Sequence, residues 1–362
     1  MKIVILGLTI TSSWGNGHAT LWRGLLKSLA KRGHQIVFFE RDVSYYAGAR
    51  DFCELPGIEI VLYPDWESVR TPAAMELREA DVAIVTSYCP DALAATDLIS
   101  SQARGLRVFY DLDTPVTLAQ LRRNQSVSYI GPNGLSGFDL VLSFTGGATL
   151  DALQTLLGAK SVAPLYGHVD PDVHAPAPPQ PHYRAALSYL GTYAADRQRT
   201  LERTFVEPAR ERLAERFLIG GAQYPADFPW SDNIYFVRHL PPSEHAAFFS
   251  SSRLTLNVTR ASMAENGWCP SGRLFEAAAC GSAVLSDPWP GLEEFFTPGS
   301  EILLTSRKGD TLAAMDMDDA EIARIGRAAR QRVLDQHTSH HRACEFERLT
   351  ESAMQPRAMV EA

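Results

Sequence analysis

Short apolar segments with the pattern of buried strands alternate with helical patterns along this chain, stop at a proline-rich segment, and then start again. The first series of predicted strands covers residues 2–8, 35–40, 58–63, 82–86, 107–110, 139–143 and 161–166. The second series covers residues 187–190, 216–219, 234–237, 253–258, 283–286 and 302–305. Strands that are each followed by a helix form parallel sheets. The sequence therefore predicts an α/β protein with two Rossmann-like domains.

Chain length and the proline-rich segment set the expected domain boundaries. At 362 residues the chain exceeds the size of one ordinary domain. We expect an N-terminal domain over residues 1–170, a semi-rigid linker over 171–184 and a C-terminal domain over 185–336, because a run of prolines forms a spacer. Residues 337–362 are predicted to contain the last helix.

Composition argues against several classes of protein. The net charge of −8 disfavours sequence-independent binding of nucleic acid, which needs a basic surface. No apolar run is long enough to span a membrane, and the first strand leads into a glycine-containing loop rather than a signal-peptide pattern. The five cysteines are scattered without a CxxC pair, which favours a reducing cytoplasm over disulfides or zinc: Cys53, Cys89, Cys269, Cys280 and Cys344.

Residues 270–296, PSGRLFEAAACGSAVLSDPWPGLEEFF, carry the strongest functional signal. Ser271 and Gly272 open a short helix whose free N–H groups form an anion site. Glu276 follows about one helical turn later, where its carboxylate can accept hydrogen bonds from a ribose. A glycine stop at Gly281, a buried strand and a second helix start come next. A nucleotide sugar requires this combination of donors for a diphosphate and a carboxylate for a diol.

This run resembles the C-terminal donor site of glycosyltransferases with the two-Rossmann B-type fold. Its S-x-R-x-F-E phrase is similar to the CgeB-like branch, near the retaining family-four enzymes. The resemblance extends over nearly the whole chain. It implies two Rossmann-like domains that face each other across a cleft, a donor bound mainly by the C-terminal domain, no metal cofactor, and a last helix that crosses back to the N-terminal domain.

The loop at residues 8–18, LTITSSWGNGH, follows the first strand but lacks the G-x-G-x-x-G spacing of a dinucleotide-binding fingerprint. Its glycines allow the backbone to approach a ligand closely. We therefore expect four loop residues on the sugar or acceptor side of the site: Ser13, Gly15, Asn16 and Gly17.

The same segment resembles the opening of inverting B-type glycosyltransferases, in which a histidine takes the acceptor proton with the help of an aspartate. The resemblance assigns the base to His18 and the aspartate to Asp111 or Asp113 in FYDLDTP. A histidine at a helix N-terminus tends towards the neutral form that suits a base. Alternatively, His18 caps the loop or contacts the donor phosphates, and the two aspartates bind a metal as a DxD motif or cap the next helix.

Further donor-site residues follow strands of the second series. Gly191 and Thr192 come at the end of one strand, and Arg197 on the next helix is a candidate bidentate ligand of phosphate, or a plain surface arginine. The resemblance implies nucleotide contacts by three later residues: Gly221, His239 and Leu240.

Two arginines approach the predicted anion site. Arg260 follows the strand at 253–258 and is the favoured catalytic cation, because fixed positive charge stabilises a leaving diphosphate. Arg273 either contributes to the anion site or pairs with Glu276 on the same helix. The Glu-x7-Glu pattern of family four is broken, because Trp268 occupies the first position. We expect Trp268 to stack on a sugar face instead.

The sequence thus predicts a cytoplasmic, metal-independent glycosyltransferase of hexosyltransferase type. Its co-substrate is a nucleotide-diphosphate sugar, with a UDP-sugar favoured, and it needs no other cofactor. The sugar, the acceptor, the retaining or inverting outcome and the oligomeric state stay open. Three alternatives remain: a sugar-nucleotide epimerase, a non-catalytic binding protein of a spore or envelope layer, and an enzyme that glycosylates modified nucleobases in DNA.

Overall fold

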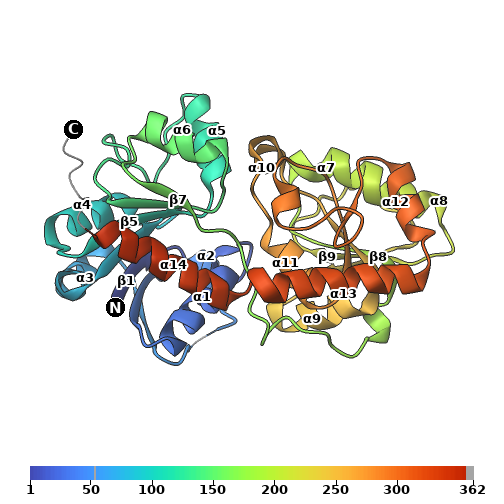
Figure 1. The fold of residues 1–362 in the computed structure, drawn as a ribbon, viewed down its shortest axis with the longest axis horizontal. Coiled ribbons are helices and arrows are strands. Elements are labelled where there is room, and N and C mark those ends of the chain that lie inside the picture. The colour runs from blue at the N-terminus through green and yellow to red at the C-terminus, as the bar shows by residue number, and fades with distance from the viewer. Residues whose placement is uncertain (53, 356–362) are drawn as a thin grey trace. The chain divides into compact units, whose positions relative to one another are not determined.

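The computed structural model describes residues 1–52 and 54–355, so the statements above on Cys53 and on residues 356–362 lie outside the described residues. The chain divides into two compact units, whose elements are labelled in Figure 1. The first unit consists of Met1–Tyr166 together with helix α14 (Ser339–Met354), and the second is Gly167–Thr338.

The first unit contains a parallel sheet with the strand order β3-β2-β1-β4-β5-β6-β7. Its strands are β1 (Lys2–Gly7), β2 (Gln35–Arg41), β3 (Ile58–Tyr63), β4 (Val82–Thr86), β5 (Leu106–Asp111), β6 (Leu140–Ser143) and β7 (Val162–Pro164). Its helices, besides α14, are α1 (His18–Lys31), α2 (Ser44–Ala47), α3 (Trp66–Glu79), α4 (Ala92–Gln102), α5 (Thr114–Arg122) and α6 (Ala148–Leu157).

Strand β1 shows why its sequence is apolar throughout. Ile3 and Ile5 belong to a buried cluster with residues of α1 and α14, whereas Val4 and Leu6 belong to a second cluster with residues of α3, α4, α5 and α6. Successive side chains of a strand point to opposite faces, and helices cover both faces of a parallel sheet. On the α14 side, Glu347 also accepts hydrogen bonds from Arg32 and His34, each at 2.7 Å.

The second unit repeats this architecture with the strand order β10-β9-β8-β11-β12-β13. Its strands are β8 (Ala185–Leu190), β9 (Phe217–Gly221), β10 (Ile234–Arg238), β11 (Ser252–Asn257), β12 (Ala283–Ser286) and β13 (Leu303–Leu304). Its α-helices are α7 (Ala195–Leu201), α8 (Glu207–Glu211), α9 (Pro242–Ser251), α10 (Ala261–Asn266), α11 (Gly272–Ala279), α12 (Lys308–Met315) and α13 (Asp319–Gln336). Helices α7, α8 and α12 lie on one side of the sheet, and α9, α11 and α13 on the other (Figure 1).

Each sheet reverses its strand order once, between β1 and β4 in the first unit and between β8 and β11 in the second. In open parallel sheets, ligands bind at the carboxyl ends of the strands beside such a reversal. The loops after β1, β4 and β5, and those after β8, β9 and β11, are therefore the expected positions of functional residues.

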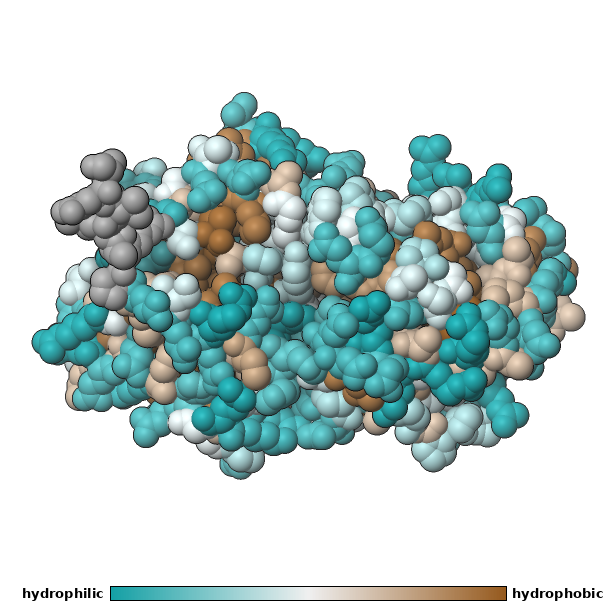
Figure 2. Space-filling view, viewed as in Figure 1, coloured by the Kyte–Doolittle hydropathy of each residue, from teal (hydrophilic) through white to brown (hydrophobic). Residues whose placement is uncertain are grey.

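The predicted fold class is confirmed, and the differences are local. The sequence analysis did not identify helix α3, which contains Pro72, nor helices α10 and α12. The helix expected after residue 290 is only a single 3₁₀ turn at Leu292–Glu294, because no helical pattern continues beyond Phe296. None of the helices within the described residues has the length and apolar character needed to cross a membrane. Most side chains on the face drawn in Figure 2 are hydrophilic.

Candidate functional site

The side chain of His18, the first residue of α1, is hydrogen-bonded to the side chain of Asp113, which follows β5. Nε2 of His18 lies 2.8 Å from Oδ2 of Asp113, and His18 is only 7% exposed. Because a carboxylate accepts the hydrogen bond, Nε2 carries the proton and Nδ1 is left as the basic nitrogen. Nδ1 is buried and has no hydrogen-bond partner among the described residues. The Asp113 side chain makes no capping bond to α5, so its geometry is that of a histidine-orienting carboxylate.

Ser87 is a third member of this hydrogen-bonded group, and its role was not predicted from the sequence. The residue follows β4, and its hydroxyl donates to Oδ2 of Asp113 at 2.8 Å while accepting from the backbone N–H of Leu112 at 3.0 Å. The carboxylate is therefore held from two sides, by Ser87 and by His18. The available signal was a polar residue directly after a buried strand.

Asp111 lies at the end of β5 and is completely buried. Its Oδ1 accepts the backbone N–H of Asp113 at 3.0 Å. Burial, together with the neighbouring Asp113 carboxylate, raises the pKa of Asp111 to about 7. Of the two aspartates predicted to assist His18, the structure brings Asp113 to the imidazole, while Asp111 holds the backbone of Asp113.

A buried carboxylate shapes the loop between β1 and α1. Glu40, near the end of β2, is 0% exposed and accepts bonds from the hydroxyl of Thr9 at 2.8 Å and from the backbone N–H groups of Ile10 and Thr11 at 2.7 and 3.0 Å. Charge-assisted bonds of this kind are about twice as strong as neutral ones. Glu40 therefore fixes a loop that the sequence analysis treated only as glycine-rich.

The four loop residues predicted on the acceptor side lie just before His18, but two of them are engaged locally. The hydroxyl of Ser13 donates to Asp51. Oδ1 of Asn16 accepts the N–H of Ala19 at 3.2 Å, in the first turn of α1. Gly15 has a positive φ of 67°, whereas an added Cβ at Gly17 would meet nothing within 4 Å.

In the second unit, the loops after β8, β9 and β10 meet at two glycines. A Cβ on Gly221 would lie 2.1 Å from the carbonyl oxygen of Gly191, so this close approach requires glycine. The hydroxyl of Tyr224 donates to the same carbonyl at 3.1 Å, and the N–H of His239 donates to the Gly221 carbonyl at 2.7 Å. Leu240, the residue after His239, is buried.

Two of the predicted arginines act electrostatically on Tyr224, the residue that bonds to Gly191. Nη1 of Arg197 donates to the carbonyl of Thr192 at 3.2 Å. Burial raises the pKa of Tyr224, and the charges of Arg197 and Arg273 both oppose that rise. Two guanidinium groups from different helices are thus within electrostatic reach of one hydroxyl, which itself bonds to Gly191.

Arg260 is engaged differently. Its Nε lies 3.3 Å from Oδ2 of Asp196, which also accepts the N–H of Ala261 at 3.2 Å. The Arg260 side chain is 44% exposed. Exposed ion pairs of this kind contribute little energy, so the pair with Asp196 is easily exchanged for another anion.

Helix α11 begins as predicted. Glu276, however, is buried, whereas a carboxylate that binds a ribose at an open surface would be exposed. The Ser271 hydroxyl accepts the N–H of Arg273 at 3.3 Å. Glu276 is 7% exposed, and its Oε2 lies 3.6 Å from Nδ1 of His245 and 3.8 Å from Nε of Arg273. Burial opposes ionisation of Glu276, but His174, His245 and Arg273 hold its pKa well below the usual range.

Trp268 is fixed against the 3₁₀ turn that follows β12. Its φ of +43° is rare for a bulky residue. Its backbone N–H donates to the Pro290 carbonyl at 2.7 Å, and its indole N–H donates to Oε1 of Glu294 at 2.6 Å. A Cβ on Gly291 would lie 2.5 Å from the indole ring. The ring is therefore seated on Gly291, in an orientation set by two hydrogen bonds.

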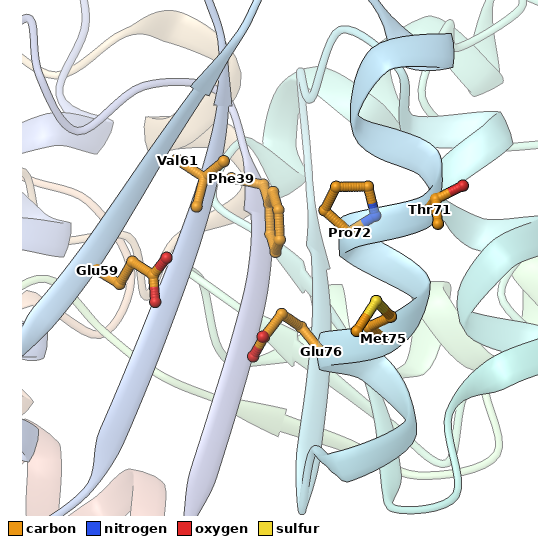
Figure 3. A pocket seen from close by; sticks show the side chains of 7 residues that line it. All are labelled: Phe39, Glu59, Val61, Thr71, Pro72, Met75 and Glu76. Atoms are coloured by element: carbon orange, nitrogen blue, oxygen red, sulfur yellow. The ribbon is translucent and has the colours of Figure 1, made fainter.

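A separate pocket lies between β2, β3 and α3 (Figure 3). It is lined by Phe39, Glu59, Val61, Thr71, Pro72, Met75 and Glu76. The residues predicted for the functional site are not among these lining residues within the described chain. We assign no function to this pocket.

Comparisons with known proteins agree with this architecture. Sucrose-phosphate synthase from Thermosynechococcus elongatus aligns with a TM-score of 0.70 at 14% identity, over 97% of this chain and 99% of that chain. HepE from Anabaena, in complex with UDP and glucose, aligns with a TM-score of 0.63 at 15% identity, over 97% and 100%. An alpha-glucosyltransferase in complex with UDP-glucose and DNA containing an abasic site aligns with a TM-score of 0.70 at 12% identity, over 97% and 99%.

These likenesses establish the fold: two parallel Rossmann-like sheets of the glycosyltransferase B type. A family model described as "Glycosyl transferase-like" matches residues 197–348, less than half of the chain. No curated protein has a matching sequence. The family match supports sugar transfer, whereas the CgeB-like branch stays a prediction.

Proposed function

We propose that this protein is a glycosyltransferase that moves a sugar from a nucleoside-diphosphate sugar, with a UDP-sugar favoured, to a hydroxyl group. One observation carries the proposal. The charges of Arg197 and Arg273 both act on the hydroxyl of Tyr224, which donates to Gly191, and Glu276 follows one turn after Arg273 on α11. Cations for a diphosphate and a carboxylate for a ribose therefore come from α7 and α11, helices that follow the strands β8 and β11 at the reversal of the second sheet.

The diphosphate leaving group gains negative charge as the bond to the sugar breaks. Arg197, Arg273 and the N–H groups at the start of α11 would stabilise that charge without rearrangement. Oε1 of Glu276, the oxygen that does not face His245, would accept the ribose hydroxyls. HepE has been solved with UDP and with UDP-glucose, which supports the choice of nucleotide.

We assign to His18 the role of the general base that takes the proton from the acceptor hydroxyl. Nδ1 of His18 would take the proton from the acceptor hydroxyl, and Asp113 would stabilise the resulting imidazolium. The acceptor oxygen then bonds to the anomeric carbon as the bond from that carbon to the diphosphate breaks. Such a direct displacement inverts the anomeric centre, so a base at His18 favours the inverting outcome.

Nucleotide binding is the first test. The purified protein is titrated calorimetrically with UDP, GDP, dTDP and ADP, as wild type and as Glu276→Gln. We expect one nucleotide, UDP, to bind best and the variant to bind it about 10-fold more weakly, because a neutral amide loses charge-assisted bonds to the ribose worth about 1.5 kcal/mol. Glu265→Gln, an exposed carboxylate on α10, is the matched control and should bind like wild type.

The donor-site assignment is wrong if no nucleotide binds, or if both variants bind UDP equally well. Turnover then separates the alternatives. Release of UDP with formation of a glycoside supports the proposal, and the anomeric configuration of the product reports inversion or retention. Isomerised donor without an acceptor would identify an epimerase, and binding without any turnover a non-catalytic protein.

A further inference from the structure

Three potential metal ligands meet inside the second unit. His174 comes from the segment that precedes β8, His245 from α9 and Glu276 from α11. They are 5%, 7% and 7% exposed, respectively. One ligand atom from each side chain lies within 4.8 Å of the other two.

The polar atoms of this cluster lack the hydrogen bonds that buried groups normally have. Among the described residues, neither ring nitrogen of His174 has a partner, and the same holds for Nδ1 of His245 and Oε2 of Glu276. Each unsatisfied buried group lowers the stability of a folded protein. Buried polar groups in native proteins nearly always have partners, so the unpartnered atoms of these three neighbouring side chains point to a shared ligand.

The spacing identifies the kind of occupant. Nδ1 of His245 lies 3.6 Å from Oε2 of Glu276, beyond the range of about 2.7–3.2 Å for a good N–H···O bond. Two ligands on one tetrahedral ion, each about 2.0–2.1 Å from it, are about 3.4 Å apart. The observed separation is therefore close to that of two ligands of one metal ion.

We propose that His174, His245 and Glu276 bind a divalent transition-metal ion, with zinc as the expected ion. Two imidazoles and one carboxylate are a common zinc ligand set, and water supplies the fourth ligand. Magnesium and calcium prefer oxygen ligands, so the two histidines argue against them. Sequence spacing does not reveal the set, because its members come from three separate segments.

The ion would have a structural effect on the donor site. It would bind Oε2 of Glu276 and leave Oε1 for the ribose hydroxyls, while joining the segment around His174 to α9 and α11. Arg273, 3.8 Å from Oε2, can share that oxygen because a carboxylate oxygen has two lone pairs. The binding site itself does not rest on the proposed function, since its three ligands need no nucleotide.

The test measures metal binding without nucleotide. Tag-free protein is stripped with a chelator and titrated with zinc in competition with a chromophoric chelator, and with cobalt, whose visible absorption reports tetrahedral nitrogen and oxygen ligation. We expect about one tightly bound ion per chain and an intense tetrahedral cobalt spectrum. His340 and Cys344, 3.7 Å apart on α14, form a possible surface site, so all titrations use a Cys344→Ser background.

Two ligand variants and one control decide the assignment. His174→Ala and His245→Asn should bind zinc at least about 100-fold more weakly, because each removes a direct ligand. His182→Ala, an exposed histidine a few residues beyond His174, should bind like the parent. Circular dichroism checks that each variant is folded. If a variant does not fold, the cobalt spectrum of the parent still tests the proposal. Absence of tight zinc and cobalt binding by the folded parent, or ligand variants that bind zinc as tightly as the parent does, would overturn the proposal whether or not UDP binds.

Discussion

Oδ2 of Asp113 receives two hydrogen bonds at 2.8 Å, one from Nε2 of His18 and one from the hydroxyl of Ser87. His18 and Ser87 follow β1 and β4, the strands at the reversal of the first sheet, and Asp113 follows β5, the neighbour of β4. The imidazole is thus oriented by a carboxylate that is itself held in place. In the proposed reaction this arrangement fixes the tautomer of His18 and stabilises its protonated form.

Replacing either member of the pair should reduce turnover more than donor binding. For His18→Gln and Asp113→Asn we expect kcat to fall by about 100-fold or more, because general-base catalysis contributes about 10²–10⁴-fold. The dissociation constant for UDP, measured by calorimetry, should change little, because the donor residues lie in the second unit. Full activity in His18→Gln would exclude its role as the base.

Ser87→Ala tests whether the second bond to Asp113 matters. A hydrogen bond to a charged group contributes about 1.5–3 kcal/mol, which sets the upper limit of the effect on the activation free energy. We expect kcat to fall by about 10-fold, because Asp113 then accepts one hydrogen bond fewer and holds the His18 imidazole less firmly. Ser136→Ala is the control, because the Ser136 hydroxyl is exposed and donates to the backbone carbonyl of Asn133 at 2.9 Å. A kcat of Ser87→Ala equal to that of wild type would contradict the assignment.

The elements of the donor region were predictable because their signals are local. Ser271 caps α11, Gly281 with a φ of +78° ends it, and β12 is entirely buried. Helix α3 was missed although Asp65 caps it by accepting the N–H of Ser68 at 3.0 Å. Pro72 inside that helix removes one backbone donor and disrupts the helical pattern.

The contacts that define the candidate site could not be derived from sequence spacing. Glu40 is a buried carboxylate because its four bonds come from a loop about 30 residues earlier in the chain. Likewise, no motif links His174 to His245 and Glu276, since strand order alone brings their segments together. Propensity and periodicity report on neighbours in sequence, whereas these contacts depend on the tertiary fold.

The raised pKa of Asp111 predicts a pH-dependent stability. Burial raises it from the ordinary value of 3.8 to about 7, so the stability of the fold is highest below pH 3.8, where both states are protonated, and falls as the pH rises from there through 7. Relative to wild type, Asp111→Asn should therefore gain about 2–3 kcal/mol of stability between pH 5 and pH 8, because two pH units of the penalty accumulate between pH 5 and pH 7. Urea unfolding at both pH values measures the difference.

Asp97→Asn is the matched control, because Asp97 is an exposed carboxylate on α4. Its free energy of unfolding should follow that of wild type at both pH values. If Asp111→Asn were equally destabilising at pH 5 and pH 8, the side chain would be ionised in the folded protein throughout.

The contact between Gly291 and Trp268 predicts a steric effect on stability. Gly291 has a φ of +85°, and an added Cβ would lie 2.5 Å from the indole ring. Gly291→Ala should lower the free energy of unfolding by about 2–4 kcal/mol, from the left-handed backbone and from overpacking together. Because Trp268 must then move, its bond to Glu294 should also be lost, and the KM for the donor should rise if the ring contacts the sugar.

Gly299 separates the two contributions. Its φ of +79° is nearly the same, but an added Cβ there would meet nothing within 4 Å. Gly299→Ala should therefore lower the free energy of unfolding by only the backbone contribution of about 1–2 kcal/mol. The KM for the donor should not change. Urea unfolding of both variants at one pH measures the contrast. Equal destabilisation by the two substitutions would show that the indole ring yields to the added methyl group without cost.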